Sequence, residues 1–419
     1  MDENDPADRS TTRSNESNVQ NQQAKVSDGW EADTRSIAIS RFRQPDRNKN
    51  TDDTLEEKLT QPEPAVEKQN AASLVTEETK GDTYALKCKI PWNATVPAPQ
   101  KRYLRRDDVF SHFTILGGPA IIVFPLSDPV RAMLEVDQIP ERDLPTTLPR
   151  SLARLLSNGD LLYRSEPNMP RLLIKVSSTI VVKVRPFLPQ DETTEYTSMK
   201  YLKEHLPELP VPRPYGLIHI RKLAYLFMSY IPDPSLDTIW PKLDHIQKTS
   251  VREQLQEIFS TLRQLRPTTK NAPLGGLSGE GCVDTRGTTR YSQKPIMNAA
   301  DFTDFLFTHD GNADPIYIRF LRSFLPNNEN TTIVFTHGDL RPANVLARLQ
   351  SDGSCLITSI IDWENGGFYP DYFESMKCTN MLSPMGTSDW FEYLPPSISP
   401  LQHRIRWLVD RIWDRQAGI

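Results

Sequence analysis

Two stretches in the second half of this chain decide its fold: Ile333-Val-Phe-Thr-His-Gly-Asp-Leu-Arg-Pro-Ala-Asn-Val-Leu346 and Leu356-Ile-Thr-Ser-Ile-Ile-Asp-Trp-Glu364. Each contains an apolar, β-branched run that predicts a strand, and Ser351-Asp-Gly353 between them is typical of a turn. We therefore expect an antiparallel hairpin. Because antiparallel pairing places the start of one strand beside the end of the other, Asn344 and Asp362 should lie side by side.

A third oxygen-bearing residue, Asp339, precedes Asn344 by five positions in a proline-containing loop and should join the same place. Converging carboxylate and amide oxygens suit a hard cation such as Mg²⁺, and a carboxylate that does not hold the metal can act as a base. A different reading makes His337, Asp339 and Asp362 the ligands of a transition metal in a hydrolase. The seven histidines of the chain include no pair at the spacing H-x-x-x-H to support it.

The ordered set of His337, Asp339, Asn344 and the Ile360-Ile-Asp-Trp-Glu364 run resembles the aminoglycoside phosphotransferase and choline kinase-like family. The continuation of that run to Glu374 is similar to the fungal branch of phosphotransferase-domain proteins. The resemblance implies an α+β, bilobal protein-kinase-like fold, with a small sheet-rich N-lobe, a larger helical C-lobe, and ATP and Mg²⁺ between them. It extends over roughly half of the chain and does not include the N-terminal tail.

The resemblance also implies roles for the residues of the motif. Asp339 becomes the catalytic aspartate that orients or deprotonates an acceptor hydroxyl, and Asn344 and Asp362 become the Mg²⁺ ligands. His337 shapes the loop through hydrogen bonds to backbone. Arg341 either faces the transferring phosphoryl group or is solvated, and the sequence leaves both open.

A basic residue lies on the predicted strand Thr179-Ile-Val-Val-Lys-Val184. Alternation places Lys183 on the opposite face from two of the valines, so it can point into a cleft, although a lysine on an exposed strand face is the plain alternative. The resemblance makes Lys183 the lysine that holds the nucleotide phosphates. It makes Glu195, which opens the following helix-like segment, the partner of that lysine, with Glu192 as a competing choice.

The segment Phe227-Met-Ser-Tyr-Ile231 falls where the family has the hinge whose backbone meets the adenine edge, so the resemblance makes Ser229 and Ile231 the adenine contacts. The chain departs from the family at Asp233-Pro234, where fungal members commonly have Pro-Gly. It also has no glycine-rich phosphate loop before the strand lysine, and Ser157-Asn-Gly159 is the only candidate.

Composition divides the chain into four parts. Residues 1–83 are polar and poor in aliphatic residues, which predicts a disordered tail. Residues 84–150 form an N-terminal extension without a recognisable motif, 151–228 are strand-rich and form the predicted N-lobe, and 229–419 form the predicted helical C-lobe with the hairpin. In that last part, apolar residues recur every three or four positions and predict amphipathic helices at 251–265 and 405–413.

The overall composition excludes several classes of protein. The 419 residues include 49 Lys and Arg against 54 Asp and Glu, a formal net charge of −5, so we expect no nucleic-acid partner. The sequence has neither a signal-peptide pattern nor an apolar run of about 18 residues, which predicts a cytoplasmic protein without membrane contact and leaves a nuclear location open. The four cysteines are far apart, as in proteins with neither disulfides nor zinc. A monomer is the simplest expectation.

These patterns predict an ATP- and Mg²⁺-dependent phosphotransferase that acts on a hydroxyl of a small molecule or, second, of a protein. The alternative is a catalytically silent kinase-like binding module that recruits a protein partner through its N-terminal tail, for example at Trp30–Phe42. The acceptor is not specified. Acidic residues between 237 and 314, with Trp240 and Trp363, would suit a cationic acceptor, but solvated helix surface explains the acidic residues better and core packing explains the tryptophans better.

Overall fold

The computed structural model describes residues 118–165, 171–186, 193–269, 271–286, 289–308, 313–328 and 330–417. The predicted tail, with Trp30–Phe42, and the competing residue Glu192 lie outside these ranges. None of the helices within them is long and apolar enough to cross a membrane.

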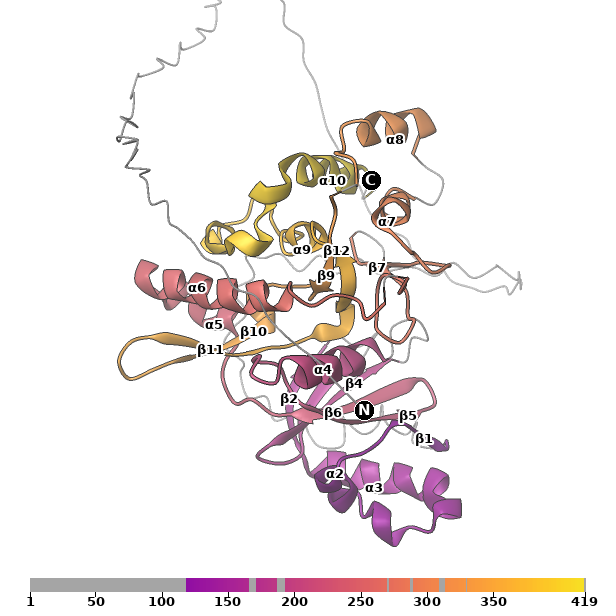
Figure 1. The fold of residues 1–419 in the computed structure, drawn as a ribbon. Helices are drawn as coiled ribbons and strands as arrows, with labels where there is room; N and C mark the ends of the chain where they lie inside the picture. Colours follow the sequence, from indigo (N-terminus) through magenta and orange to yellow (C-terminus); the bar gives the residue numbers. More distant parts are fainter. Residues whose placement is uncertain are drawn as a thin grey trace, which may run out of the picture. The chain divides into compact units, whose positions relative to one another are not determined.

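Six strands of the described residues form one antiparallel sheet in the order β1-β5-β6-β4-β3-β2 (Figure 1). They are β1 (Ala120–Phe124), β2 (Asp160–Arg164), β3 (Leu172–Lys175), β4 (Ile180–Pro186), β5 (Pro214–Ile220) and β6 (Leu223–Ser229). The predicted strand that contains Lys183 is present as β4, and it pairs with β3 and β6. Central β4 and β6 are buried for nearly their whole length, in keeping with their almost continuous apolar sequence.

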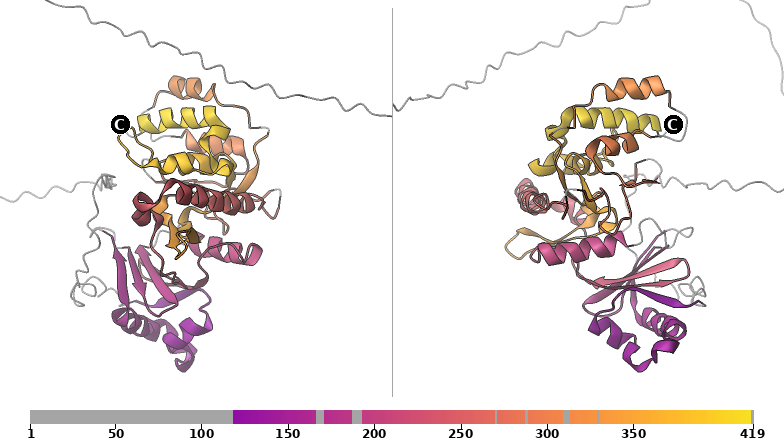
Figure 2. Two further views of the ribbon diagram at one scale, coloured as in Figure 1. Left: turned by 90° about the vertical axis from the view of Figure 1, so that its left-hand side faces the viewer. Right: turned by 45° about the vertical axis from the view of Figure 1, so that its right-hand side comes forward.

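Helices α2 (Asp128–Met133) and α3 (Leu144–Asn158) cover one face of this sheet (Figures 1 and 2). The buried leucines of α3 recur every four residues, the spacing of one helix face, and pack with the valines of β4; they are Leu148, Leu152 and Leu156. The sequence patterns do not predict α2 or α3, because Pro145 and Pro149 interrupt the leucine spacing in the first turns of α3.

Helix α4 (Thr194–His205) covers the opposite face of the sheet, and the helix predicted there is confirmed. Its buried apolar side chains pack with Val181 of β4 and with β5 and β6; they are Tyr196, Met199 and Leu202. Alternation along β4 sends Val182 and Val184 to the α3 side. Lys183 is thereby directed to the α4 side, where it meets Glu195.

The rest of the described chain is mainly helical. Its α-helices are α5 (Leu236–Ile239), α6 (His245–Leu262), α7 (Ala299–Leu306), α8 (Pro315–Arg322), α9 (Phe373–Lys377) and α10 (Arg404–Ala417). Short 3₁₀-helices in the described chain are η1 (Val136–Gln138), η2 (Glu141–Asp143), η3 (Trp240–Lys242), η4 (Pro342–Asn344), η5 (Trp363–Asn365), η6 (Asp389–Tyr393), η7 (Pro396–Ile398) and η8 (Pro400–His403). The architecture is the α+β arrangement that the sequence predicts: a sheet-rich part followed by a larger helical part.

The two predicted amphipathic helices are confirmed as α6 and α10, with different outcomes for their apolar stripes. In α6 the predicted stripe is buried at Val251, Leu255 and Leu262 and half-buried at Ile258, whereas Leu265 lies beyond the end of the helix. A capping box at the start of α6 satisfies backbone donors. In α10 only Val409 and Trp413 of the predicted stripe are buried, whereas Ile405, Leu408 and Ile412 are exposed. Trp240 and Trp363 are core residues, so neither offers an open aromatic wall.

Short strand pairs complete the helical part. The predicted hairpin is present as β10 (Val345–Leu349) and β11 (Cys355–Ile360), with Val345 opposite Ile360. β9 (Ile333–Thr336) pairs with β12 (Gly367–Pro370), and β7 (Val283–Asp284) with β8 (Arg290–Tyr291). The loop that carries Asp339 runs from β9 to β10. Because β9 is paired with β12 and β10 with β11, both ends of this loop are fixed.

A histidine is buried inside the sheet away from this loop. His219 on β5 lies opposite Ile121 of β1 and Ala224 of β6, and it is 8% exposed. Burial, and the positive charge of Arg185, lower the pKa of His219 from 6.5 to about 4.

The free energy of unfolding should therefore fall as the pH falls from about 6.5 to about 4. In this window the unfolded chain binds a proton at His219 that the native chain does not, which costs at most about 3 kcal/mol. His219→Gln should remove this part of the pH dependence. Urea unfolding of both proteins at pH 7, 5.5 and 4 measures the difference, and parallel pH curves for the two would contradict the prediction.

Candidate active site

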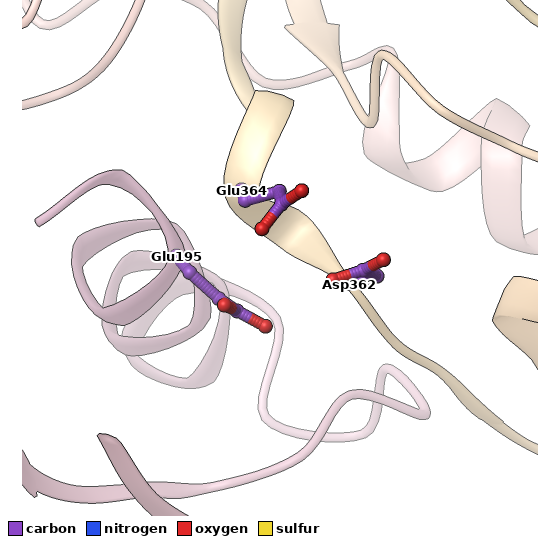
Figure 3. Close-up of side chains that lie close together, drawn as sticks. All are labelled: Glu195, Asp362 and Glu364. Atoms are coloured by element: carbon purple, nitrogen blue, oxygen red, sulfur yellow. The ribbon is translucent and has the colours of Figure 1, made fainter. Parts of the chain in front are cut away.

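One lysine and three carboxylates meet where the sheet faces the hairpin. Lys183 of β4 donates to both carboxylate oxygens of Glu195 on α4, at 3.0 and 2.8 Å, and to Asp362 Oδ1. Its Nζ also lies 3.4 Å from Glu364 Oε2. Figure 3 shows Glu195 extending from its helix toward Asp362 and Glu364 of the segment after β11. We call these four residues the lysine cluster.

The charges of the lysine cluster depend on one another. Burial alone would lower the pKa of Lys183, but the carboxylates of Asp362, Glu195 and Glu364 outweigh it and hold that pKa well above its usual value. Burial would likewise raise the pKa of Glu364, but Lys183 and Arg171 keep it well below its usual range. Glu195 is the most buried of the three carboxylates, and burial raises its pKa despite the charge of Lys183, with the negative charges of Asp362 and Glu364 adding to the rise. The cluster therefore holds a charged lysine among three acidic side chains.

Asp362 adopts a left-handed backbone conformation, with φ 69° and ψ 54°. Aspartate tolerates this conformation better than most side chains, and it still costs about 1–2 kcal/mol. The strain is maintained because the preceding residue is fixed: the Ile361 amide donates to Asn344 O at 2.9 Å. The turn at Asp362 directs its carboxylate to Lys183 rather than along the strand.

The loop before β10 positions the other predicted site residues. The Asn344 side-chain amide donates to Asp339 O at 2.8 Å and to Asp339 Oδ2 at 3.0 Å. Arg341 Nε lies 3.4 Å from the same Asp339 Oδ2, and Arg341 is partly exposed. Asn344 is 3% exposed, whereas the Asp339 side chain remains 32% exposed. The carboxylate of Asp339 is thus held on one side and open on the other.

His337 is fully buried and connects this loop to the hairpin. Its Nδ1 accepts from the Asp339 amide at 3.1 Å, and its Nε2 donates to Ile361 O at 2.9 Å. These two bonds assign the tautomer with a proton on Nε2. Because both ring nitrogens are engaged with backbone, His337 is not free to bind a metal in this arrangement, which argues against the transition-metal interpretation.

Glu374 of α9 is a site residue that sequence reasoning missed. One of its oxygens, Oε2, accepts from the amides of His337 at 2.6 Å and Gly338 at 3.1 Å. Gly338 has φ +77°, and a Cβ there would lie 2.6 Å from Asn365 O, so only glycine fits this turn. The available signal was an acidic residue directly after the apolar pair Tyr372-Phe373, since a carboxylate buried with them needs partners.

The predicted hinge residues lie at and just after the end of β6, the strand that pairs with β4 and so with Lys183. Ser229 ends β6 opposite Ile180, three residue pairs from Lys183, or about 10 Å. Its amide and hydroxyl bond to the backbone of Arg213, both at 2.9 Å. Ile231, two residues on, is half-buried. The departure at Asp233 is fixed by two hydrogen bonds from Arg348 of β10, at 2.8 and 3.0 Å.

The candidate glycine loop is not where a phosphate loop would be needed. Gly159 ends α3, and a Cβ there would contact Ile174 and Lys175 O, so this glycine serves close packing. The connection from β2 to β3 precedes Lys183 along the chain, and its residues 165–171 contain no glycine; positions 166–170 of it lie outside the described ranges. Arg171 at its end donates to Glu364 Oε1 at 2.8 Å.

The antiparallel sheet, the lysine–glutamate pair and the loop joined to the hairpin define a protein-kinase-like α+β protein. A model of the phosphotransferase enzyme family (APH) matches residues 171–392, just over half of the chain. The chain therefore belongs to the phosphotransferase enzyme family. The predicted resemblance is confirmed at this level, and its fungal branch stays a prediction.

Among solved structures, the chain is similar to the streptomycin–ATP–APH(2")-IIa ternary complex, with a TM-score of 0.42 and 13% identity over 64% of this chain and 85% of that chain. The ADP-bound aminoglycoside phosphotransferase APH(2'')-Ib gives a TM-score of 0.40 and 12% identity over 64% and 84%. The aminoglycoside-3'-phosphotransferase of type VIII gives 0.38 and 16% over 64% and 96%. A comparison with curated proteins finds no match.

Replacing Glu374 by Ala should destabilise the protein by about 2–4 kcal/mol, because two buried backbone amides lose their acceptor. Glu374→Gln keeps one acceptor oxygen and should cost less. Urea unfolding measures both, with Glu204→Ala on the exposed side of α4 as a matched control. A loss no larger than that of Glu204→Ala would contradict the role of Glu374.

Proposed function

We propose that this protein is an ATP- and Mg²⁺-dependent phosphotransferase that transfers the terminal phosphoryl group of ATP to a hydroxyl of a small molecule. The observation that carries the proposal is the lysine cluster beside the Asp339 loop. Lys183 is fixed by Glu195 and contacts Asp362. The His337 ring joins this loop to the cluster through two hydrogen bonds, one with the Asp339 amide and one with the carbonyl of Ile361, the residue before Asp362. Phosphoryl transfer depends mainly on such positioning and charge neutralisation.

In this proposal the nucleotide lies along β4 and β6. The adenine edge meets the backbone at Ser229 and Ile231, and the phosphates reach Lys183, about 10 Å away along the strands. Glu195 holds the ammonium of Lys183 in place: its buried carboxylate oxygen Oε2 lies 2.8 Å from Lys183 Nζ, the distance of a strong charge-assisted hydrogen bond. The charged state of Lys183, favoured by its three acidic neighbours, is the state that binds a phosphate.

The donors around Asp362 fit magnesium. Asn344 and Asp362 offer amide and carboxylate oxygens, and carboxylate oxygens of Glu195, Asp362 and Glu364 lie within 4.8 Å of one another. Hard oxygen donors without a free imidazole or thiolate favour Mg²⁺ over softer metals. Bound there through Asn344 and Asp362, Mg²⁺ would neutralise phosphate charge. Glu364 is an additional acidic donor at the same place.

Asp339 is the proposed catalytic base. Its carboxylate is oriented by Asn344 and remains partly exposed, so an acceptor hydroxyl can reach it. Arg341, next to Asp339 Oδ2, can meet the charge of the phosphoryl group as it transfers. His337 acts through the backbone as a positioning residue. The retention of this whole set favours catalysis over a silent binding module.

The acceptor is left as a hydroxyl compound without further assignment. The acidic residues of the helical part do not argue for a cationic acceptor, because several are already neutralised: Asp284 is buried between Arg286 and Arg290, and Asp304 pairs with Arg322.

ATP with Mg²⁺ should raise the melting temperature of the wild-type protein by about 5 °C at a hundred times the dissociation constant. Asp362→Asn should abolish this shift, because the phosphates lose the metal carboxylate. Asp339→Asn is the matched control and should keep it, since Asp339 meets the acceptor. Differential scanning fluorimetry with ATP, with and without EDTA, measures all three proteins.

The comparison uses the shift and not the melting temperature itself, because Asp362→Asn also changes the contacts of Lys183. An equal shift in EDTA would contradict the metal dependence. A full shift in Asp362→Asn would contradict the assignment of the metal ligand.

A further inference from the structure

The connection from β2 to β3 has no glycine in its sequence, and Arg171 at its end contacts Glu364 of the lysine cluster. In a phosphate-binding turn, glycines allow backbone amides to approach the ligand closely. Here the turn is closed differently: the Ser165 amide donates to Arg171 O at 3.0 Å, and Ser165 Oγ accepts from the Arg171 amide at 2.9 Å. These two bonds fix the backbone of Arg171 at the start of β3.

Strand register directs the Arg171 side chain toward the lysine cluster. Leu173 lies opposite Lys183, so both share the α4 face of the sheet, and Arg171 is two residues before Leu173 on that same face. Arg164, the last residue of β2, lies opposite Leu172, whose side chain packs on the other face with α3. One hairpin thus presents an arginine on each face.

Arg171 and Lys183 bind the two oxygens of a single carboxylate. Arg171 Nη1 lies 2.8 Å from Glu364 Oε1, and Lys183 Nζ lies 3.4 Å from Glu364 Oε2. The Arg171 side chain is 44% exposed, so a ligand from solvent can reach it. A guanidinium and an ammonium held this close together match the oxygens of neighbouring phosphates, and arginine binds phosphate with two parallel hydrogen bonds.

We propose that Arg171 is a nucleotide-phosphate ligand that takes the place of a glycine-rich loop in this chain. The inference rests on the proposed function. Glu364 holds the guanidinium of Arg171 beside Lys183. A phosphate group can compete with Glu364 for this guanidinium, because a phosphate offers more negative charge and more acceptor oxygens than a carboxylate.

The test compares ligands with and without phosphates. Dissociation constants of ATP with Mg²⁺, ADP with Mg²⁺ and adenosine are measured by isothermal titration calorimetry for the wild type, Arg171→Gln, Arg171→Lys and Arg164→Gln. Arg171→Gln should bind ATP about tenfold to a hundredfold more weakly and adenosine as tightly as the wild type. Arg171→Lys should recover part of the ATP affinity, and Arg164→Gln should behave as the wild type.

Two results would overturn this inference alone. Wild-type ATP affinity in Arg171→Gln would mean that the guanidinium does not reach the phosphates. An equal loss for ATP and adenosine would mean that the Arg171–Glu364 pair serves only to hold the sheet near the hairpin. If the wild type bound none of the three compounds, the proposed function would fail as well.

Discussion

The ammonium of Lys183 contacts Glu195 on α4 and Asp362 and Glu364 after β11, so one buried charge ties the sheet to the hairpin. A buried ion is tolerated only when it is paired, and removal of one partner leaves the others uncompensated. The alternation of side chains along β4 determines where this charge lies. Val182 and Val184 pack into the core on the α3 face, so Lys183 between them points to the opposite face. Glu195 on α4, Asp362 at its left-handed turn and Glu364 all direct carboxylate oxygens at this charge.

A second set of bonds holds the Asp339 loop without any help from Lys183. Glu374 accepts hydrogen bonds from the consecutive amides of His337 and Gly338. The His337 ring accepts from the Asp339 amide and donates to Ile361 O. Because Ile361 immediately precedes Asp362, the two sets meet across a single peptide unit. The proposed base, Asp339, and the proposed metal ligand, Asp362, are therefore fixed relative to one another by the buried His337 ring, which bonds to backbone groups on both sides.

Local patterns predicted some of this and could not predict the rest. The hairpin was predictable because β-branched runs flank a Ser-Asp-Gly turn, and the pairing then placed Asn344 next to the residue before Asp362. Lys183 and Glu195 were predicted through the family resemblance, since twelve residues separate them and no local pattern links them. Arg171 and Glu364, 193 positions apart, could not be paired at all. Helix α3 was not predicted, because Pro145 and Pro149 near its start argue against a helix, and its leucine stripe is accounted for only by packing against the sheet.

The central claim is that Asp339 promotes phosphoryl transfer from ATP to a hydroxyl. The most direct measurement is ADP formation from ATP and Mg²⁺ in the presence of a panel of alcohols, amino alcohols and sugars, for the wild type and for Asp339→Ala. We expect at least one compound to raise the wild-type rate above the rate with water alone, and Asp339→Ala to show no such increase while it still binds ATP. Equal rates of ADP formation in the two proteins would contradict the account.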